Sequence, residues 1–181
     1  HLTTRRQRQM CIRDSLYAST IFIPYIQSLK LDNLTIASPD MGGSKRAYAY
    51  SKFLESDVVV CYKERKKANV ISNMELIGDV KSKNVIIVDD MIDTAGTISK
   101  AADLMHERGA ISVRAICTHA ILSGNAFEKI EKSKIKELIV TDSIKQSKKS
   151  KKIKVLTCSK LFADVMYNVN NNKSINSFFI K

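Results

Sequence analysis

Residues 85–97 read VIIVDDMIDTAGT, and this stretch decides the fold. Its first four residues are apolar and β-branched, which predicts a buried strand. Two adjacent carboxylates, Asp89 and Asp90, follow the strand, and a short turn containing Gly96 then leads into a helical pattern that ends near Arg108, with Gly109 as the expected stop. A strand, a turn and a helix in this order predict the start of a βαβ unit.

The same arrangement repeats on both sides of this stretch. Further apolar runs predict strands at 34–38, 57–62, 111–120, 137–142 and 153–158. Helical spacing predicts helices at 44–56, 98–108 and 160–168. The predicted strands are apolar throughout rather than alternating, which suits a sheet covered on both faces. The sequence therefore predicts an α/β fold, a three-layer sandwich with a parallel β-sheet flanked by helices.

The turn after the strand at 84–90 has the composition of a phosphate-binding loop. Ligands of such folds bind outside the carboxyl ends of the strands. A tight turn into a helix aims backbone N–H groups and the positive end of the helix dipole at one point, and Gly96 is expected to supply the backbone angles. The hydroxyls of Thr94 and Thr97 can donate as well, while Asp89 and Asp90 can accept from the vicinal hydroxyls of a sugar. A phosphate beside a diol describes a ribose phosphate, and the alternative is a solvent-exposed acidic turn.

Residues 85–97 resemble the phosphoribosyl-diphosphate binding motif of two groups, the type I phosphoribosyltransferases and the ribose-phosphate diphosphokinases. The resemblance implies the type I phosphoribosyltransferase fold. It also implies that Asp89 and Asp90 hold the ribose hydroxyls. The residues it implies for the 5-phosphate are Asp93, Thr94, Ala95, Gly96 and Thr97. This motif alone does not choose between the two groups.

Two further segments favour the diphosphokinases. Residues 38–46, SPDMGGSKR, resemble their diphosphate-side loop, in which Gly42 and Gly43 let the backbone approach anionic oxygens and Asp40 can hold Mg²⁺. Residues 63–70, KERKKANV, resemble their flexible catalytic loop, whose pattern places on Lys63 and Arg65 the neutralisation of charge on a transferred diphosphoryl group. The alternatives are an ordinary Pro/Gly turn and a solvated basic hairpin.

The resemblance continues through 75–80, 117–124 and 140–144, from about Leu16 to the carboxyl terminus. It implies transfer of diphosphate from ATP, with Mg²⁺, to O1 of ribose 5-phosphate, in a cytoplasmic homo-oligomer, since the family forms hexamers. Members of this family carry a second, related domain before this one that supplies much of the ATP pocket. Residues 16–181 are therefore expected to be a carboxyl-terminal domain, which leaves catalysis by this chain alone in question. A phosphoribosyltransferase and a non-catalytic regulatory relative remain alternatives.

Composition narrows the partners of the chain. The net charge of +12 fits either a nucleic-acid or membrane-binding face or an enzyme of polyphosphates, and the wide spread of the lysines favours the enzyme. The densest basic run, 145–154, contains no aromatic residue that could stack on a base, so it is expected to be a solvated loop, with an anion-binding tail as the alternative. No apolar stretch approaches the roughly 18 residues of a membrane helix.

Three other features carry weaker expectations. The cysteines are isolated, which predicts free thiols in a reducing compartment such as the cytosol, at Cys11, Cys61, Cys117 and Cys158. His119 follows a predicted strand and is expected to be structural rather than a catalytic base. Residues 1–15 contain arginine but no lysine and show no apolar periodicity, so they are expected to be foreign to the fold, with a basic functional arm as the alternative.

Overall fold

The computed structural model describes residues 16–67 and 70–178, and it describes 63–67 and 70–73 by their backbone alone. The segment 1–15, and with it Cys11, lies outside the described residues. Seven strands form one sheet in the order β3-β2-β1-β4-β5-β6-β7. Their bounds are Leu34–Ser38 (β1), Asp57–Lys67 (β2), Val70–Ile77 (β3), Asn84–Ile92 (β4), Ser112–Ala120 (β5), Ile135–Thr141 (β6) and Ile153–Leu156 (β7).

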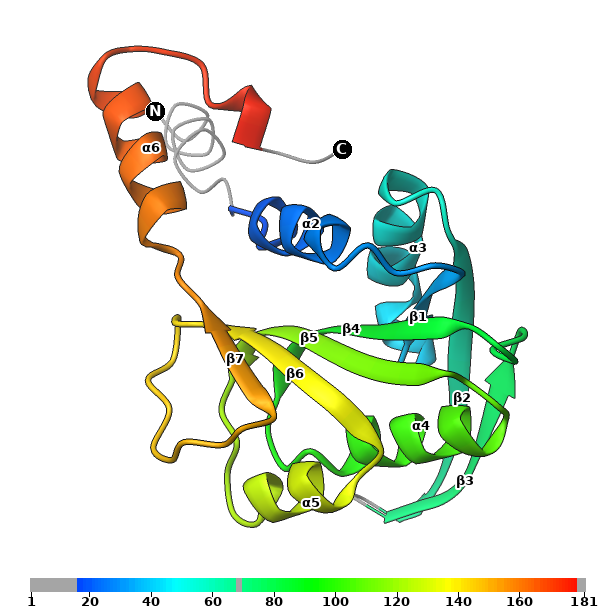
Figure 1. Cartoon of the computed structure of the whole chain (residues 1–181). Helices are drawn as coiled ribbons and strands as arrows, with labels where there is room; N and C mark the ends of the chain where they lie inside the picture. The colour runs from blue at the N-terminus through cyan, green and yellow to red at the C-terminus, as the bar shows by residue number, and fades with distance from the viewer. Residues whose placement is uncertain (1–15, 68–69, 179–181) are drawn as a thin grey trace, which may run out of the picture.

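Helices cover both faces of this sheet and make the predicted three layers (Figure 1). The helices α2 (Ser19–Ser28) and α3 (Ser44–Phe53) lie on one face, and α4 (Gly96–Glu107) and α5 (Ala126–Lys132) lie on the other. The last helix, α6 (Ser159–Asn170), follows β7 and lies on the side of α2. Two short 3-10 helices complete the described chain, η1 (Met41–Gly43) and η2 (Asn176–Phe178).

The central strand β4 explains why both faces must be covered. Val85 and Ile87 point into the hydrophobic core under α4 and α5, whereas Ile86 and Val88 belong to the core under α2 and α3. All four side chains are at most 1% exposed. The apolar run predicted as a strand buried on both faces is therefore confirmed, because each face of β4 packs into a different core.

One edge of the sheet departs from the expected parallel arrangement. The neighbouring strands of the sheet run parallel except β2 and β3, which pair antiparallel from Val60 opposite Ile77 to Lys67 opposite Val70. Only residues 68–69 separate these two strands, and so short a connection can join antiparallel but not parallel neighbours. The segment expected to be a loop is thus largely part of a hairpin.

Two helices were not predicted, and one predicted helix end is confirmed. The helix α2 contains Pro24, which lacks an N–H and argues against a helix in sequence reasoning, yet Phe22, Ile23 and Ile26 bury its inner face. The short α5 gives too few turns for a clear helical pattern. The helix α4 ends at Glu107, and Gly109 then takes the positive φ of 89° that stops it.

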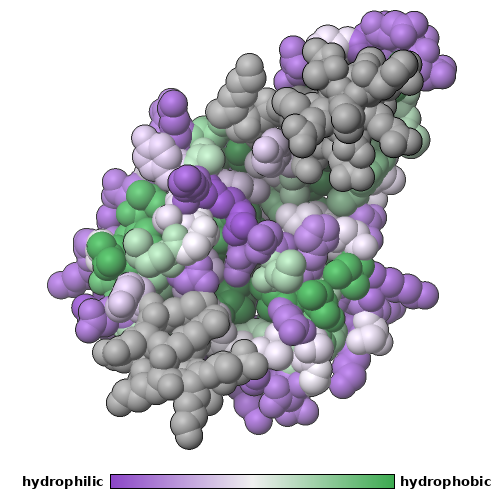
Figure 2. All heavy atoms as spheres, turned by 180° about the vertical axis from the view of Figure 1, so that it is seen from behind, coloured by the Kyte–Doolittle hydropathy of each residue, from purple (hydrophilic) through white to green (hydrophobic). Residues whose placement is uncertain are grey.

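The surface mixes polar and apolar side chains rather than presenting one uniform face, as the view from behind shows (Figure 2). Within the described residues, no helix combines the length and the hydropathy that a membrane span requires. The cysteines in this part are free thiols, with Cys61 and Cys117 buried and Cys158 partly exposed, as expected for isolated thiols.

Candidate functional site

The strands β1 and β4 lie side by side at the point where the direction of the chain reverses. After β1 the chain crosses over α3 to β2 on one side, and after β4 it crosses over α4 to β5 on the other. A parallel sheet leaves a crevice at such a point, outside the carboxyl ends of the two strands. Residues that follow β1 and residues that end β4 are thereby brought together, although more than 40 residues separate them in sequence, as the 43-residue span from Arg46 to Asp89 shows.

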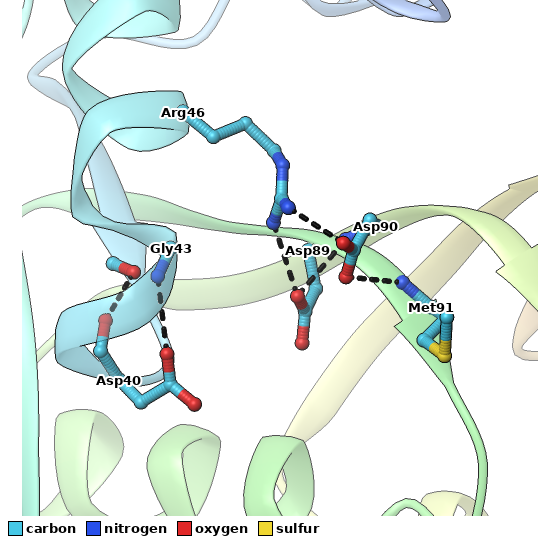
Figure 3. A network of polar contacts seen from close by, with 7 residues as sticks. Asp40, Gly43, Arg46, Asp89, Asp90 and Met91 are labelled. Carbon is cyan, nitrogen blue, oxygen red and sulfur yellow. Dashed lines mark hydrogen bonds and ion pairs between the residues drawn. The ribbon is translucent and has the colours of Figure 1, made fainter.

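Arg46, in the first turn of α3, joins the two loops (Figure 3). Its Nη1 lies 3.1 Å from Asp89 Oδ1 and its Nη2 lies 2.8 Å from Asp90 Oδ2. Backbone donors fix the carboxylates further, since Asp90 N donates to Asp89 Oδ1 at 2.9 Å and Met91 N donates to Asp90 Oδ1 at 2.9 Å. The predicted sugar-binding carboxylates are therefore held in one orientation before any ligand arrives.

The two carboxyl groups differ in their affinity for protons. Burial raises the pKa of Asp89 to about 6. The hydrogen bond from the Asp90 N–H and the charge of Arg46 act to lower this pKa, whereas the Asp90 side chain acts to raise it. Burial also acts to raise the pKa of Asp90, but Arg46 and the hydrogen bonds to its carboxylate outweigh that effect, so the pKa of Asp90 is lowered. Asp90 is therefore the carboxylate that stays ionised to lower pH, and Asp89 is the first of the two to be protonated as the pH falls.

The turn between β4 and α4 has the open N–H groups expected of an anion site. Ala95 has a left-handed backbone, with φ of 58° and ψ of 7°, and α4 begins at the next residue. The first N–H of the helix with a backbone acceptor is that of Ser99, which donates to Ala95 O at 3.1 Å. In the described part of the chain, the N–H groups of Gly96, Thr97 and Ile98 make no backbone hydrogen bond, so they remain available to an anion.

A cavity of about 250 Å³ lies over this turn. Asp89 forms one part of its wall, and the rest consists of Met91, Ile92, Asp93, Thr94, Ala95, Gly96, Thr97 and Ile98. The structure therefore brings the predicted phosphate loop and one of the predicted sugar carboxylates to a single cavity. Asp90 instead lines, together with Asp89, a second cavity of about 660 Å³ on the side of α2 and α3.

Gly96 does not have the role in backbone geometry that its sequence position suggested. The positive φ of the turn belongs to Ala95, and Gly96 is not among the glycines with positive φ. A Cβ placed on Gly96 would lie 3.9 Å from Thr94 Oγ1 and 4.0 Å from Lys129 Nζ, which is ordinary contact. What Gly96 provides is therefore open space above the helix terminus, bounded by one hydroxyl and one ammonium group.

The carboxylate of Asp93 helps to hold the loop in its conformation. It accepts a short hydrogen bond from the Ser123 hydroxyl, and Ser123 N donates to Asp93 O at 3.1 Å. A carboxylate would repel a phosphate, so this bond accounts for an acidic residue beside an anion site. The expected role of Asp93 in phosphate binding stays a prediction. In the structure, its contact with Ser123 holds the loop against the segment that follows β5.

The loop after β1 is shaped by Asp40 and two glycines. Asp40 Oδ1 accepts from Gly43 N at 3.1 Å, and Ser38 Oγ donates to Asp40 O at 2.6 Å. A Cβ on Gly43 would come within 2.7 Å of Ser38 Oγ, and one on Gly42 within 3.2 Å of Asp40 Oδ1, so the close turn depends on the missing side chains. The loop is compact, and Figure 3 shows the Asp40 carboxylate turned toward Gly43 and apart from the guanidinium of Arg46.

Asp40 is the residue that the sequence predicts to hold Mg²⁺. Among the described residues, His, Cys, Asp and Glu do not gather in any group of three or more that could hold a metal ion. Mg²⁺ commonly binds through one or two carboxylates, several waters and the phosphate oxygens of a substrate. The predicted part of Asp40 in holding Mg²⁺ therefore stays a prediction, in which water and phosphate oxygens would supply the other ligands.

The predicted catalytic pair stands on the hairpin at the sheet edge. The backbone of Lys63 pairs with that of Met74, and the backbone of Arg65 pairs with that of Ile71. The side chains of Lys63 and Arg65 lie outside the described residues, so their predicted roles stay predictions. His119 donates or accepts through Nδ1 at 3.0 Å from Ser143 Oγ and also lines the second cavity.

Three residues that shape this site had no role predicted from the sequence. Arg46 lay in the quoted loop motif, and its place in the first helical turn after β1 was the available signal. Ser123 and Lys129 carried no comparable signal, because each contacts the phosphate loop from a segment at least 30 residues away in sequence. Their contribution follows only from the pairing of β4 with β5.

Comparison with known proteins agrees with this geometry. Residues 66–180 match the Phosphoribosyl synthetase-associated domain. The ribose-phosphate pyrophosphokinase of Porphyromonas gingivalis is 48% identical over 167 residues, which cover 92% of this chain and 53% of that protein. The enzyme of the same name from Wolinella succinogenes is 50% identical over 167 residues, with 92% and 54% covered.

A solved structure gives the same answer for the fold. The crystal structure of phosphoribosylpyrophosphate synthetase from Mycobacterium smegmatis superposes with a TM-score of 0.77 at 31% identity, covering 86% of this chain and 51% of that one. The chain spans about half the length of the curated relatives it matches. With the matched domain, the relatives and the fold in agreement, the chain belongs to the family of ribose-phosphate pyrophosphokinases, that is, ribose-phosphate diphosphokinases.

Proposed function

We propose that this chain carries the ribose 5-phosphate site of a ribose-phosphate diphosphokinase, which transfers diphosphate from MgATP to O1 of ribose 5-phosphate. The observation that carries the proposal is that Asp89 lines the same cavity as the loop 93–97. A carboxylate that accepts from sugar hydroxyls thus lies beside N–H groups that suit a phosphate. Because both features line one cavity, they suit a molecule that has a diol and a phosphate, as a pentose phosphate does.

In the proposed reaction, O1 of the sugar gives up its proton to solvent and bonds to the β-phosphorus of ATP. The bond from that phosphorus to the α,β-bridging oxygen breaks, and AMP leaves with that oxygen. Asp89 and Asp90 hold the ribose hydroxyls, and the loop 93–97 holds the 5-phosphate, so the reacting oxygen is fixed in place. Lys63 and Arg65 neutralise the negative charge that spreads over the transferred group. Magnesium held at Asp40 would supply further positive charge to the diphosphate oxygens.

The rest of the proposal concerns the whole protein. Residues 16–181 are proposed to be the carboxyl-terminal domain of a two-domain enzyme, in agreement with a chain that spans about half the length of its relatives. The missing part of the ATP pocket would then come from the other domain. A cytosolic homo-oligomer, as the family resemblance implies, completes the proposal. No nucleic-acid or membrane partner is proposed.

Two measurements, made one after the other, test the proposed function. Calorimetric titration of the chain with ribose 5-phosphate tests the sugar site without the other domain. Diphosphate transfer is tested in a chimera that joins this chain to the remaining half of the Porphyromonas gingivalis relative, supplied with ATP, Mg²⁺ and ribose 5-phosphate. Release of AMP that depends on ribose 5-phosphate supports the proposal. A chimera that folds and binds both substrates, yet releases no AMP, contradicts it.

A further inference from the structure

The helix α5 lies against the phosphate loop and brings a cation to it. Lys129 Nζ donates to the carbonyl oxygen of Thr94 at 3.0 Å, across 35 residues of sequence. Ser123, which precedes α5, holds the neighbouring Asp93 by its hydroxyl and its N–H. The loop is therefore fixed from one segment at two successive residues, and one of the two contacts is positively charged.

The same ammonium group borders the space that Gly96 leaves open. A Cβ at Gly96 would lie 4.0 Å from Lys129 Nζ and 3.9 Å from Thr94 Oγ1. Apart from its chain neighbours and the backbone of its own helix, no other heavy atom of the described residues would come within 4 Å. Gly96 and Thr94 line the cavity and Lys129 lies just beyond its lining residues, so an oxygen atom seated above Gly96 would approach a hydroxyl and an ammonium group together. The N–H groups of Gly96 and Thr97, in the same first turn of α4, make no backbone hydrogen bond among the described residues.

The charge of Lys129 is not matched by a carboxylate. Among the side chains that the structure describes, no carboxylate oxygen lies within 4.0 Å of its Nζ. An ammonium group has three donors, and the bond to Thr94 O uses one of them. A lysine that spends one donor on a loop carbonyl and keeps its charge unpaired is suited to a second, anionic acceptor.

We propose that Lys129 is a specificity-determining ligand of the 5-phosphate: it holds the Thr94 carbonyl with one N–H and donates another to a phosphate oxygen above Gly96. This inference rests on the proposed ribose 5-phosphate site. It adds a cation to a loop that otherwise offers only neutral donors and a helix dipole. Lys129 therefore favours a doubly charged phosphate monoester over a singly charged ester of the same shape.

Neutral variants of Lys129 test this role by calorimetry on the full chain. Lys129→Met keeps most of the side-chain volume, and Lys129→Gln keeps a donor, so one serves if the other does not fold. The ligands are ribose 5-phosphate, a dianion above its second pKa of about 6, and ribose 5-sulfate, a monoanion. Lys132→Met on the same helix is the matched control, because Lys132 is exposed and forms no hydrogen bond or ion pair with the loop in the described part of the chain.

The expected result is a loss of about 10-fold in affinity for ribose 5-phosphate, the size of one charge-assisted hydrogen bond at a partly exposed site. The loss for ribose 5-sulfate should be several-fold smaller, Lys129→Arg should keep most of the affinity, and Lys132→Met should change neither ligand. Equal losses for both ligands would mean that Lys129 only braces the loop, and unchanged affinities would remove it from the site. Either outcome overturns the inference while the proposed function stands, whereas a wild-type chain that binds no ribose 5-phosphate overturns both.

Discussion

Arg46 Nη2 lies 2.8 Å from Asp90 Oδ2, and this contact ties the helix after β1 to the end of β4. The pair is only partly buried, with side-chain exposures of 33% and 56%. The pair therefore serves mainly to position the Asp90 carboxylate and adds little to stability, because exposed ion pairs contribute little free energy of folding. A carboxylate has about four lone-pair sites, so the arginine fixes the orientation of Asp90 and leaves acceptors for sugar hydroxyls.

Removal of the guanidinium should weaken sugar binding. In Arg46→Met, Asp89 and Asp90 lose the group that orients them, and we expect affinity for ribose 5-phosphate to fall about 10-fold. Arg46→Lys should restore only part of it, since one ammonium cannot reproduce two bonds from a planar fork. Calorimetry measures both, with Lys52→Met in the last turn of α3 as the control. Equal affinity in Arg46→Met and the wild type would refute the positioning role.

The two aspartates should respond in opposite ways to removal of their charge. The folded pKa of Asp89 is raised to about 6, so its ionisation opposes folding, and that cost appears as the pH rises from about 4 to about 6. Asp89→Asn mimics the protonated form and should raise stability by about 1–2 kcal/mol at pH 7.5, with allowance for solvent screening, and not at pH 4.

Asp90→Asn is the matched comparison. Because the pKa of Asp90 is lowered in the fold, its ionised form contributes stability at neutral pH that is lost as the pH falls through that lowered value. Asp90→Asn should therefore lower the melting temperature at pH 7.5. Thermal melts of both variants at pH 4 and pH 7.5 give the sign directly. A destabilised Asp89→Asn at pH 7.5 would show that burial does not dominate at Asp89.

Substitutions at the neighbouring residues Ala95 and Gly96 should affect stability and ribose 5-phosphate binding differently. Gly96→Ala places a methyl group in the open space without strained angles, so the melting temperature should change little while ribose 5-phosphate binding is lost. Ala95→Val puts a β-branched residue at a φ of 58° and should cost stability as well as binding, roughly 1–3 kcal/mol. Ala95→Gly should keep both. Normal binding by Gly96→Ala would move the phosphate elsewhere.

The hairpin residues should matter for chemistry and not for sugar binding. In a complete enzyme, Lys63→Ala and Arg65→Ala should each lower kcat by several powers of ten with little change in ribose 5-phosphate affinity, because their charges act mainly in the transition state. Arginine stabilisation of phosphoryl transfer is worth roughly 10³ to 10⁵ in GTPases. Lys66→Ala and Lys67→Ala are the controls. Four small, salt-dependent effects of equal size would indicate a generic basic patch.

An element was predictable from the sequence where neighbouring residues supply the whole signal for it. The strand β4 and the turn into α4 were predictable because one continuous stretch supplies the buried run, the carboxylates and the helix start. The extension of β2 to Lys67 and its partner β3 were not, since the charges at 63–67 suit a loop as well as an edge hairpin.

The site shows the same division between local and distant signals. Asp89 and the loop 93–97 share a cavity because they are adjacent in sequence. The contacts of Arg46 and Lys129 span 43 and 35 residues, so they depend on strand order, which periodicity does not give. The positive φ of Ala95 was also hidden, because alanine rarely adopts it and Gly96 stands next to it.

The central claim is that Asp89 and Asp90 hold the hydroxyls of ribose 5-phosphate. Calorimetric titration of the chain and of the double variant Asp89→Ala, Asp90→Ala tests it most directly, with circular dichroism to establish that both are folded. Two charge-assisted hydrogen bonds are worth roughly 3 kcal/mol or more, so we expect the double variant to bind at least about 100-fold more weakly. A folded double variant that binds ribose 5-phosphate as tightly as the wild type would contradict the account.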